Sequence, residues 1–264
     1  MADVKKIATR VSYGEALVEL ANEHDDFVVL DADLAAATQT GKFKAACPDR
    51  FFDVGIAESN LMGVAAGIAT TGRVAFASSF AMFAAGRAFE QVRNSIGYPH
   101  LNVKIGATHG GISVGEDGAS HQCCEDFALM RSIPGMTVLC PSSFQELREM
   151  LRYAIYDVEG PVAVRYSRGG EGAYQGSAPV EPATLLRTGA DITLAGYGMM
   201  LNQLLDCADR LARNGIQAEV VKLNTITPIP LERLTASVQK TGRLLVAEDS
   251  AAAGGVGQRI AAGL

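Results

Sequence analysis

A short glycine-rich segment carries many of the side chains that could do chemistry in this chain. Residues 108–122 read THGGISVGEDGASHQ and directly follow an apolar run, 103–107, that is typical of a buried strand. The segment holds four glycines together with two histidines and two acids: His109, Glu116, Asp117 and His121. Glycine lets the backbone turn tightly and approach a ligand, and α/β proteins place ligands in the loops that follow strands. The segment is therefore predicted to form part of a site.

Two kinds of site could use this mixture of side chains. His109, Asp117 and His121, with Cys123 and Cys124 close by, would be candidate metal ligands, but their spacing matches none of the common zinc patterns. Hydrogen-bond donors and acceptors for a polyhydroxylated substrate suit the mixture better. We therefore expect no metal ligands here, and we interpret the two cysteines as small packing residues.

Five residues outside this segment have both a functional and an ordinary interpretation. Glu58 opens a helical segment directly after a strand, where the helix dipole alone favours an acid, but its carboxylate could also share a proton with a ligand nitrogen. Phe80 and Phe83 would lie on one helix face, either in the core or as a stacking platform for a flat ring. Arg165 and Arg168 lie at the end of a strand, where they could clamp a phosphate or form an ordinary solvated basic edge. Local sequence leaves these alternatives open.

Strands and helices alternate along the first two thirds of the chain. Short apolar runs predict strands at 27–34, 51–56, 73–77, 103–107, 136–141 and 161–167. Helices are predicted at 58–71, 81–96, 125–131 and 144–156, with another from Ser12, whose spacing to Glu15 matches a capping box. This alternation predicts an α/β fold with a parallel sheet sandwiched by helices.

A Gly-, Pro- and Ser-rich stretch at 168–182 predicts a linker, after which the alternation starts again. Strands are expected at 191–196, 217–223 and 243–247, and helices at 200–214 and 231–239, with an unfinished helix from Gly257. We therefore expect two domains, residues 1–172 and a smaller, incomplete α/β domain at residues 183–264.

The composition narrows the class of protein. The 264 residues are 48% hydrophobic, enough for a substantial core, and the formal charge of −6 favours no nucleic-acid partner. Five cysteines are a poor disulfide framework and fit a reducing compartment. The first residues lack the apolar core of a signal peptide, and the uncharged runs are too short for a membrane helix. A cytoplasmic protein is expected.

Taken together, these segments resemble the carboxyl-terminal half of transketolase. The match is carried by LDADL, FFDVGIAESNLMGVAAGIA, SSFAMFAAGRAFEQVR, THGGISVGEDGASHQ, LCPSS and VRYSRGG, in that order. VKLNTITPIP and VAEDSAAAGGVGQ resemble the family's last domain, so the resemblance covers nearly the whole chain. It implies a thiamine-diphosphate pyrimidine-binding domain followed by a transketolase C-terminal-like domain.

The resemblance also implies roles for individual residues. In the family a glutamate hydrogen-bonds the aminopyrimidine ring of thiamine diphosphate, and Glu58 is its match. Phe80 and Phe83 match the aromatics that pack on that ring, and Asp33 matches an acid near the cofactor. The residues that match contacts to the sugar substrate are His109, Asp117, His121 and the sugar-phosphate anchor Arg168. The expected catalytic residues are Glu58, His109 and His121.

One family feature is missing from the sequence. Transketolases hold the diphosphate and its magnesium or calcium ion with a GDG…N segment in an amino-terminal domain, and this chain has no such segment. The resemblance therefore implies one subunit of a split transketolase, which pairs with a separate diphosphate-binding subunit and associates with itself in a two-plus-two heterotetramer. The implied reaction transfers a two-carbon ketol unit from a ketose phosphate to an aldose phosphate, as in pentose phosphate metabolism.

Two other functions share this architecture. One is the β subunit of a 2-oxo acid dehydrogenase, or an enzyme like deoxyxylulose phosphate synthase; the loop with both His109 and His121 favours sugar chemistry instead. The other is a non-catalytic regulatory partner. The joint presence of five residues argues against it: Glu58, Phe83, His109, Asp117 and His121.

Overall fold

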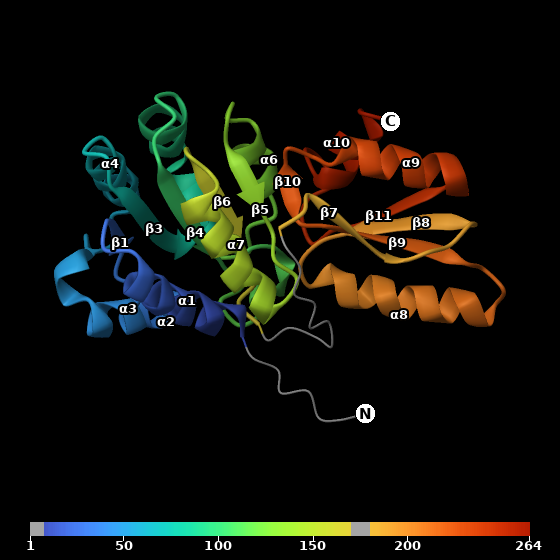
Figure 1. The fold of residues 1–264 in the computed structure, drawn as a ribbon, viewed down its shortest axis with the longest axis horizontal. Helices are drawn as coiled ribbons and strands as arrows, with labels where there is room; N and C mark the ends of the chain where they lie inside the picture. The colour runs from blue at the N-terminus through green and yellow to red at the C-terminus, as the bar shows by residue number, and fades with distance from the viewer. Residues whose placement is uncertain (1–7, 170–179) are drawn as a thin grey trace.

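The computed structural model describes residues 8–169 and 180–264. Its centre is a seven-stranded sheet with the strand order β10-β5-β6-β4-β3-β1-β2 (Figure 1). All neighbouring pairs are parallel except β10 with β5 at the edge. The strands are β1 (Phe27–Asp31), β2 (Phe51–Asp53), β3 (Val74–Phe80), β4 (Val103–Thr108), β5 (Thr137–Leu139), β6 (Val162–Arg165) and β10 (Thr225–Thr227).

Helices cover both faces of this sheet, as the α/β prediction requires (Figure 1). Successive side chains of a strand point to opposite faces, so Val28 and Leu30 enter one core while Phe27 and Val29 enter the other. The first face is covered by α4 (Glu58–Ala69), α5 (Phe89–Gln91) and α6 (Asp126–Arg131). The second is covered by α1 (Thr9–Glu23), α2 (Ala35–Thr38), α3 (Gly41–Ala46) and α7 (Phe144–Tyr156).

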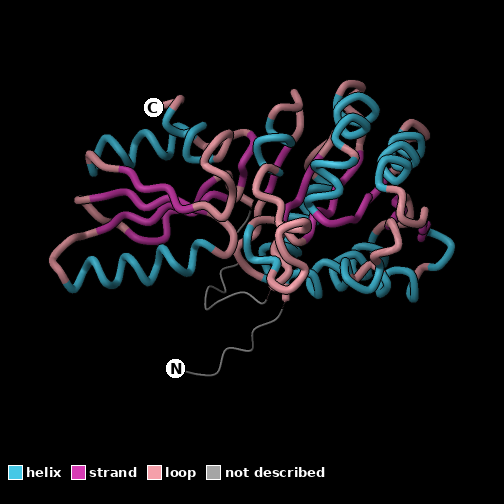
Figure 2. The backbone as a smooth tube through the Cα atoms, turned by 180° about the vertical axis from the view of Figure 1, so that it is seen from behind, coloured by secondary structure: helices cyan, strands magenta, loops and turns pink. Residues whose placement is uncertain are grey.

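A second sheet of four strands follows, with the order β11-β8-β9-β7. Its strands lie between helices on both sides, as the rear view also shows (Figure 2). The strands are β7 (Ala183–Arg187), β8 (Ile192–Gly196), β9 (Ala218–Leu223) and β11 (Leu244–Ala247), and the helices are α8 (Met200–Arg213), α9 (Leu231–Thr241) and α10 (Val256–Ala261). Apart from the antiparallel edge strand β7, the sheet is parallel.

Some sequence predictions of local structure were wrong. The helix predicted from Ser12 begins at Thr9, and Ser12 lies buried inside it with its hydroxyl donating to the carbonyl of Phe144 (2.7 Å). A capping contact occurs instead at α7, where the hydroxyl of Ser143 accepts from the amide of Glu146 (3.1 Å). The hydroxyl of Ser12 thus serves helix–helix packing rather than capping.

The helix predicted at 81–96 is also not a regular α-helix. Two π-helical segments, Met82–Arg87 and Val92–Gly97, flank the short α5. Such π turns are rare and frequently occur at functional sites. The strands β7 and β10 were not predicted, and the predicted linker lies mostly outside the described residues. Within the described part of the chain, no helix is long and apolar enough to cross a membrane.

Candidate active site

The residues singled out by sequence gather where the strands of the large sheet end. β3 and β4 are parallel neighbours, and their register pairs Phe80 with Thr108, the last residue of each strand. His109 is the next residue, so the register brings its ring beside that of Phe80. Glu58 begins α4, which follows β2 along the chain. The carboxyl ends of parallel strands lie at one edge of a sheet, where α/β proteins bind their ligands.

Four rings form one aromatic cluster at this edge. His109 stacks on Phe80 with ring centroids 3.8 Å apart and an interplanar angle of 23°. Phe80 and Phe83 lie nearly parallel, 5.7 Å apart at 15°. His121 stands edge-on to Phe83 at 5.3 Å and 72°. The structure therefore brings Phe80, Phe83 and both loop histidines together, and because Phe83 is only partly buried, its ring can also contact a ligand.

His109 is held as a neutral ring. Its backbone adopts the left-handed conformation (φ 61°), and its side chain is 1% exposed. Burial is the main reason that the pKa of His109 falls to about 4, and the positive charge of Arg10 lowers it further. Its Nδ1 lies 3.1 Å from the hydroxyl of Thr108, and its Nε2 lies 4.0 Å from a carboxylate oxygen of Asp117. At neutral pH the ring therefore offers one N–H donor and one acceptor nitrogen.

Glu58 is buried, although it is the first residue of its helix. Its side chain is 2% exposed, and Oε2 accepts a hydrogen bond from Nη1 of Arg87 at 2.8 Å. The guanidinium of Arg87 also lies over the ring of Phe83, 4.5 Å from its centroid. An acid placed only to favour the helix dipole would sit in solvent, so this burial supports the functional interpretation of Glu58. Sequence reasoning missed Arg87, whose position four residues after Phe83 was its only local signal.

The rest of the loop folds against Arg168. The guanidinium pairs with the carboxylate of Glu116, its Nε lies 3.5 Å from Asp117 Oδ2, and its Nη1 donates to the carbonyl of Val114 (3.3 Å). The hydrogen bond from Arg168 lowers the pKa of Glu116 to about 2. In this structure two carboxylates thus balance the charge of the predicted phosphate anchor.

A buried ion cluster lies directly behind the loop. Arg165 is 3% exposed; its Nε donates to Asp126 (2.9 Å), and its two terminal nitrogens donate to Asp249 (3.1 and 2.9 Å). A Cβ atom on Gly110 would lie 2.1 Å from Nε of Arg165, and one on Gly111 would lie 2.2 Å from a carboxylate oxygen of Asp249. Both alternatives offered for Arg165, a phosphate clamp and a solvated edge, were wrong, because its charge is neutralised inside the protein.

Asp33 lies in the loop that follows β1, the strand beside β3. It is exposed, with a left-handed backbone (φ 60°), and its amide donates to Asp53 (3.0 Å). The neighbouring Asp31 is fully buried, and its carboxylate accepts from the hydroxyls of Thr38 (2.7 Å) and Thr40 (2.8 Å). The buried carboxylate of Asp31 therefore fixes the conformation of this loop, and the side chain of Asp33 in the same loop is exposed.

The described residues fit part of a cofactor site. The partly exposed ring of Phe83, the buried carboxylate of Glu58 and the neutral imidazole of His109 suit a flat heteroaromatic ring. Across the described ranges, no group of three or more His, Cys, Asp or Glu side chains is arranged to hold a metal ion. Cys123 is buried in the core, as a packing residue would be.

Comparisons with known proteins agree with this architecture. Residues 5–170 match the family described as "Transketolase, pyrimidine binding domain", and residues 182–264 match "Transketolase, C-terminal domain". The chain is 44% identical over 257 residues to the putative transketolase C-terminal section of Methanocaldococcus jannaschii, covering 96% of this chain and 80% of that protein. It is 36% identical to 1-deoxy-D-xylulose-5-phosphate synthase of Desulforudis audaxviator, covering 94% of this chain but 39% of that protein.

Among solved structures, one titled "Split gene transketolase, inactive beta4 tetramer" superposes with a TM-score of 0.90 at 47% identity. The alignment covers 98% of this chain and 85% of that one. A doubly covered parallel sheet with its polar site at the carboxyl edge defines an α/β protein of the ligand-binding type. Together with these matches, it shows that the chain belongs to the transketolase family.

Proposed function

We propose that this chain is one subunit of a two-chain transketolase, which moves a two-carbon ketol unit from a ketose to an aldose with thiamine diphosphate. The observation that carries the proposal is the buried carboxylate of Glu58 at the edge where Phe80, Phe83, His109 and His121 gather. We assign the pyrimidine-binding unit to residues 1–172 and the C-terminal-like unit to residues 183–264.

In this proposal the chain's own residues prepare the cofactor and hold the sugar. When bound, thiamine diphosphate supplies the nucleophilic carbon and the electron sink for breaking a carbon–carbon bond. Glu58 shares a proton with a nitrogen of the aminopyrimidine ring, in a position where water does not compete. The rings of Phe80 and Phe83 pack against that ring. We assign Asp33 to the same cofactor-binding part of the site.

The substrate half of the site is assigned to the glycine-rich loop. Because His109 stays neutral at physiological pH, its N–H donates a hydrogen bond to the ketose carbonyl without adding charge. His121 and Asp117 contact the sugar hydroxyls. Arg168 binds the phosphate of a sugar phosphate, and its pairing with Glu116 means that the phosphate must displace a carboxylate.

A separate partner subunit supplies the diphosphate-binding half and the magnesium or calcium ion in this proposal. Two exposed apolar side chains support such an interface, since Ile56 is 77% exposed close to Glu58 and Ile112 is 60% exposed in the glycine-rich loop. The names of two relatives, "C-terminal section" and "Split gene transketolase, inactive beta4 tetramer", point the same way. We propose a cytoplasmic heterotetramer in which this subunit also contacts its own copy.

The test combines this chain with a purified diphosphate-binding subunit, thiamine diphosphate, Mg²⁺, a ketose donor and an aldose acceptor. We expect ketol transfer that is lost in Glu58→Gln, because the amide cannot give up and recover a proton. Glu232→Gln, the same chemical change at an exposed position of α9, serves as the matched control and should leave the rate unchanged.

The other outcomes separate the alternatives. Condensation of pyruvate with an aldose phosphate, or turnover of another 2-oxo acid, without ketol transfer would reassign the chain to the synthase or dehydrogenase function. An absence of turnover with every substrate, despite formation of the complex, would favour a regulatory partner. Ketol transfer by Glu58→Gln at the wild-type rate would refute the assigned mechanism.

A further inference from the structure

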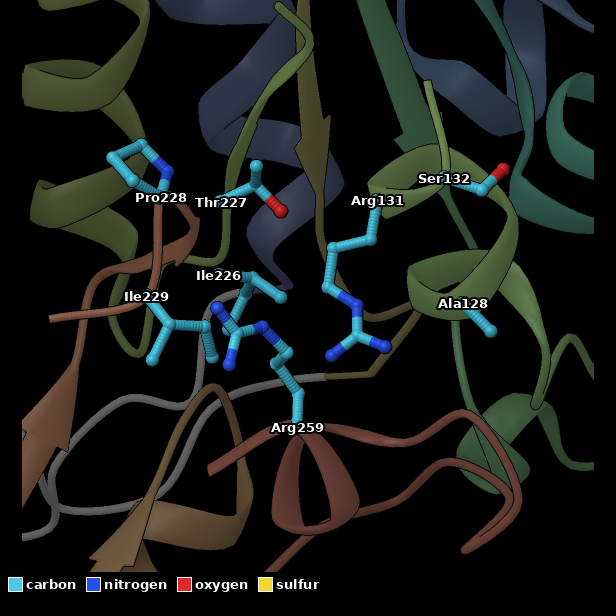
Figure 3. Close-up of a pocket in the computed structure, with 8 residues that line it drawn as sticks. All are labelled: Ala128, Arg131, Ser132, Ile226, Thr227, Pro228, Ile229 and Arg259. Carbon is cyan, nitrogen blue, oxygen red and sulfur yellow. The ribbon is translucent and has the colours of Figure 1, made fainter. Parts of the chain in front are cut away.

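A pocket lies between the two domains, away from the aromatic cluster. It has a volume of about 430 Å³ and is lined from α6, from β10 with the turn that follows it, and from α10 (Figure 3). Arg131 is the last residue of α6, while Asp126 of the buried ion cluster is its first. Thr227 pairs with Val138 near the start of β5. The pocket therefore lies toward the opposite end of the sheet from the candidate active site.

Two arginines give this pocket a positive charge. The guanidinium groups of Arg131 and Arg259 both extend into the space between the elements (Figure 3). Burial lowers the pKa of Arg131, the charge of Arg259 lowers it further, and the charge of Glu248 raises it. The nearby acid, Glu248, uses its oxygens to accept from the amides of Val256 (2.8 Å) and Gly257 (3.3 Å) at the start of α10. Glu248 therefore serves the start of α10, while its negative charge also offsets part of the positive charge of Arg131.

The pocket is also preorganised. Arg131 donates to the carbonyls of Gly254 (2.8 Å) and Gly255 (3.4 Å), which fixes the position of its guanidinium through neutral acceptors. Opposite it, the Thr227 hydroxyl points toward the Arg131 side chain (Figure 3). This hydroxyl oxygen is buried and has no hydrogen-bond partner among the described residues. Native proteins rarely leave such a group without a partner, so this wall of the pocket is incompletely satisfied.

The remaining wall is apolar, formed by Ile226, Pro228 and Ile229. Two guanidinium groups beside an apolar wall match a molecule that has an anionic group at one end and a carbon skeleton at the other. We propose that this interdomain pocket is a binding site for a small organic phosphate, with its phosphate between Arg131 and Arg259 and its body against Ile226 and Ile229. The site is separate from the proposed catalytic function and stands without it.

The test measures binding of two probes, inorganic phosphate and phenyl phosphate, by isothermal titration calorimetry at constant ionic strength. We expect saturable binding at millimolar or lower concentrations, tighter for phenyl phosphate because its ring contacts the apolar wall. Equal affinity for both probes would assign the site to free phosphate and overturn the organic class of ligand. Absence of saturable binding by either probe would overturn the site itself.

Variants locate the binding. Arg259→Gln removes a guanidinium while leaving the bonds of Arg131 to Gly254 and Gly255 in place. It should weaken binding about tenfold or more, the usual value of a charge-assisted contact. Arg210→Gln, at a 73% exposed position of α8, is the matched control and should bind as the wild type does. Arg168→Gln removes the arginine of the glycine-rich loop and tests whether phosphate binds there instead. Binding that is kept in Arg168→Gln but weakened in Arg259→Gln belongs to the interdomain pocket. Unchanged affinity in Arg259→Gln would refute the proposal.

Discussion

The buried ion cluster behind the glycine-rich loop makes a quantitative prediction about Asp249. This residue belongs to the second domain, yet it receives both terminal nitrogens of Arg165 from the first, at 3.1 and 2.9 Å. The backbone carbonyl of Asp249 also accepts from the amide of Ile112 in the loop (3.3 Å). Asp249→Ala therefore removes the side-chain half of a junction between the second domain and the loop that carries His109.

The size of the effect follows from the burial of Arg165, which is 3% exposed. Removing one partner of a buried ion pair costs about 3–5 kcal/mol, because the remaining charge stays out of water. Arg165 keeps its bond to Asp126, so we expect the lower end, about 3 kcal/mol, for Asp249→Ala. Asp249→Asn keeps one acceptor oxygen and should cost less, about 2 kcal/mol.

Urea unfolding measures this cost. With a slope of about 3 kcal/mol per M, the upper part of the usual range for small proteins, Asp249→Ala should lower the midpoint by about 1 M. Amide exchange at Gly111 and Ile112 should also become faster than in the wild type. The control is Asp206→Ala, which breaks an exposed pair with Arg210 on α8 and should cost less than about 0.5 kcal/mol. If the two variants unfold at the same midpoint with unchanged exchange, the cluster does not join the domains.

Three further predictions concern buried positions. The pKa of His109 is lowered to about 4 in the folded chain, below the value of about 6.5 for an unfolded histidine. The folded state should therefore lose stability as the pH falls from about 6.5 toward 4. Over that range the urea midpoint of His109→Gln should fall less than that of the wild type. Gly110→Ala puts a Cβ 2.1 Å from Nε of Arg165 and should cost about 2 kcal/mol in urea unfolding, whereas Gly63→Ala, with open space in α4, should stabilise by up to about 1 kcal/mol. Burial lowers the pKa of Lys104 to about 7, so stability should rise between pH 7 and 10, and Lys104→Met should flatten that rise.

Elements with a strong local pattern were predicted well from the sequence. The helix predicted at 144–156 has the bounds of α7, because its apolar periodicity and the capping Ser143 are both local signals. The strand predicted at 103–107 differs from β4 by one residue for the same reason. β7 and β10 were missed because both are short edge strands whose existence depends on a distant pairing partner. The pairing of β10 with β5 spans more than eighty residues and that of β7 with β9 more than thirty, and pairing at such separations leaves no periodicity to read.

The same distinction applies to the candidate site. Glu58 and the loop histidines were found because their types and spacing are unusual within one short segment. Arg87 and Asp249 were missed because what matters about each is its partner, which only the fold brings close. The role of Arg165 was misjudged for the same reason, because nothing in the local sequence indicates that a charged residue at the end of a strand is buried.

Strand β10 has a consequence for any attempt to divide this chain. It belongs to the carboxyl-terminal part of the sequence but forms the outermost strand of the amino-terminal sheet, beside β5. A fragment that stops before β7 would leave the free edge of β5 with unpaired N–H and C=O groups. Open edges of this kind recruit strands from other molecules and lead to aggregation. The second domain therefore covers the open edge of the first domain's sheet and protects it from aggregation. A fragment of the first domain that includes an edge strand beside β5 should stay soluble under conditions in which the fragment without that strand precipitates.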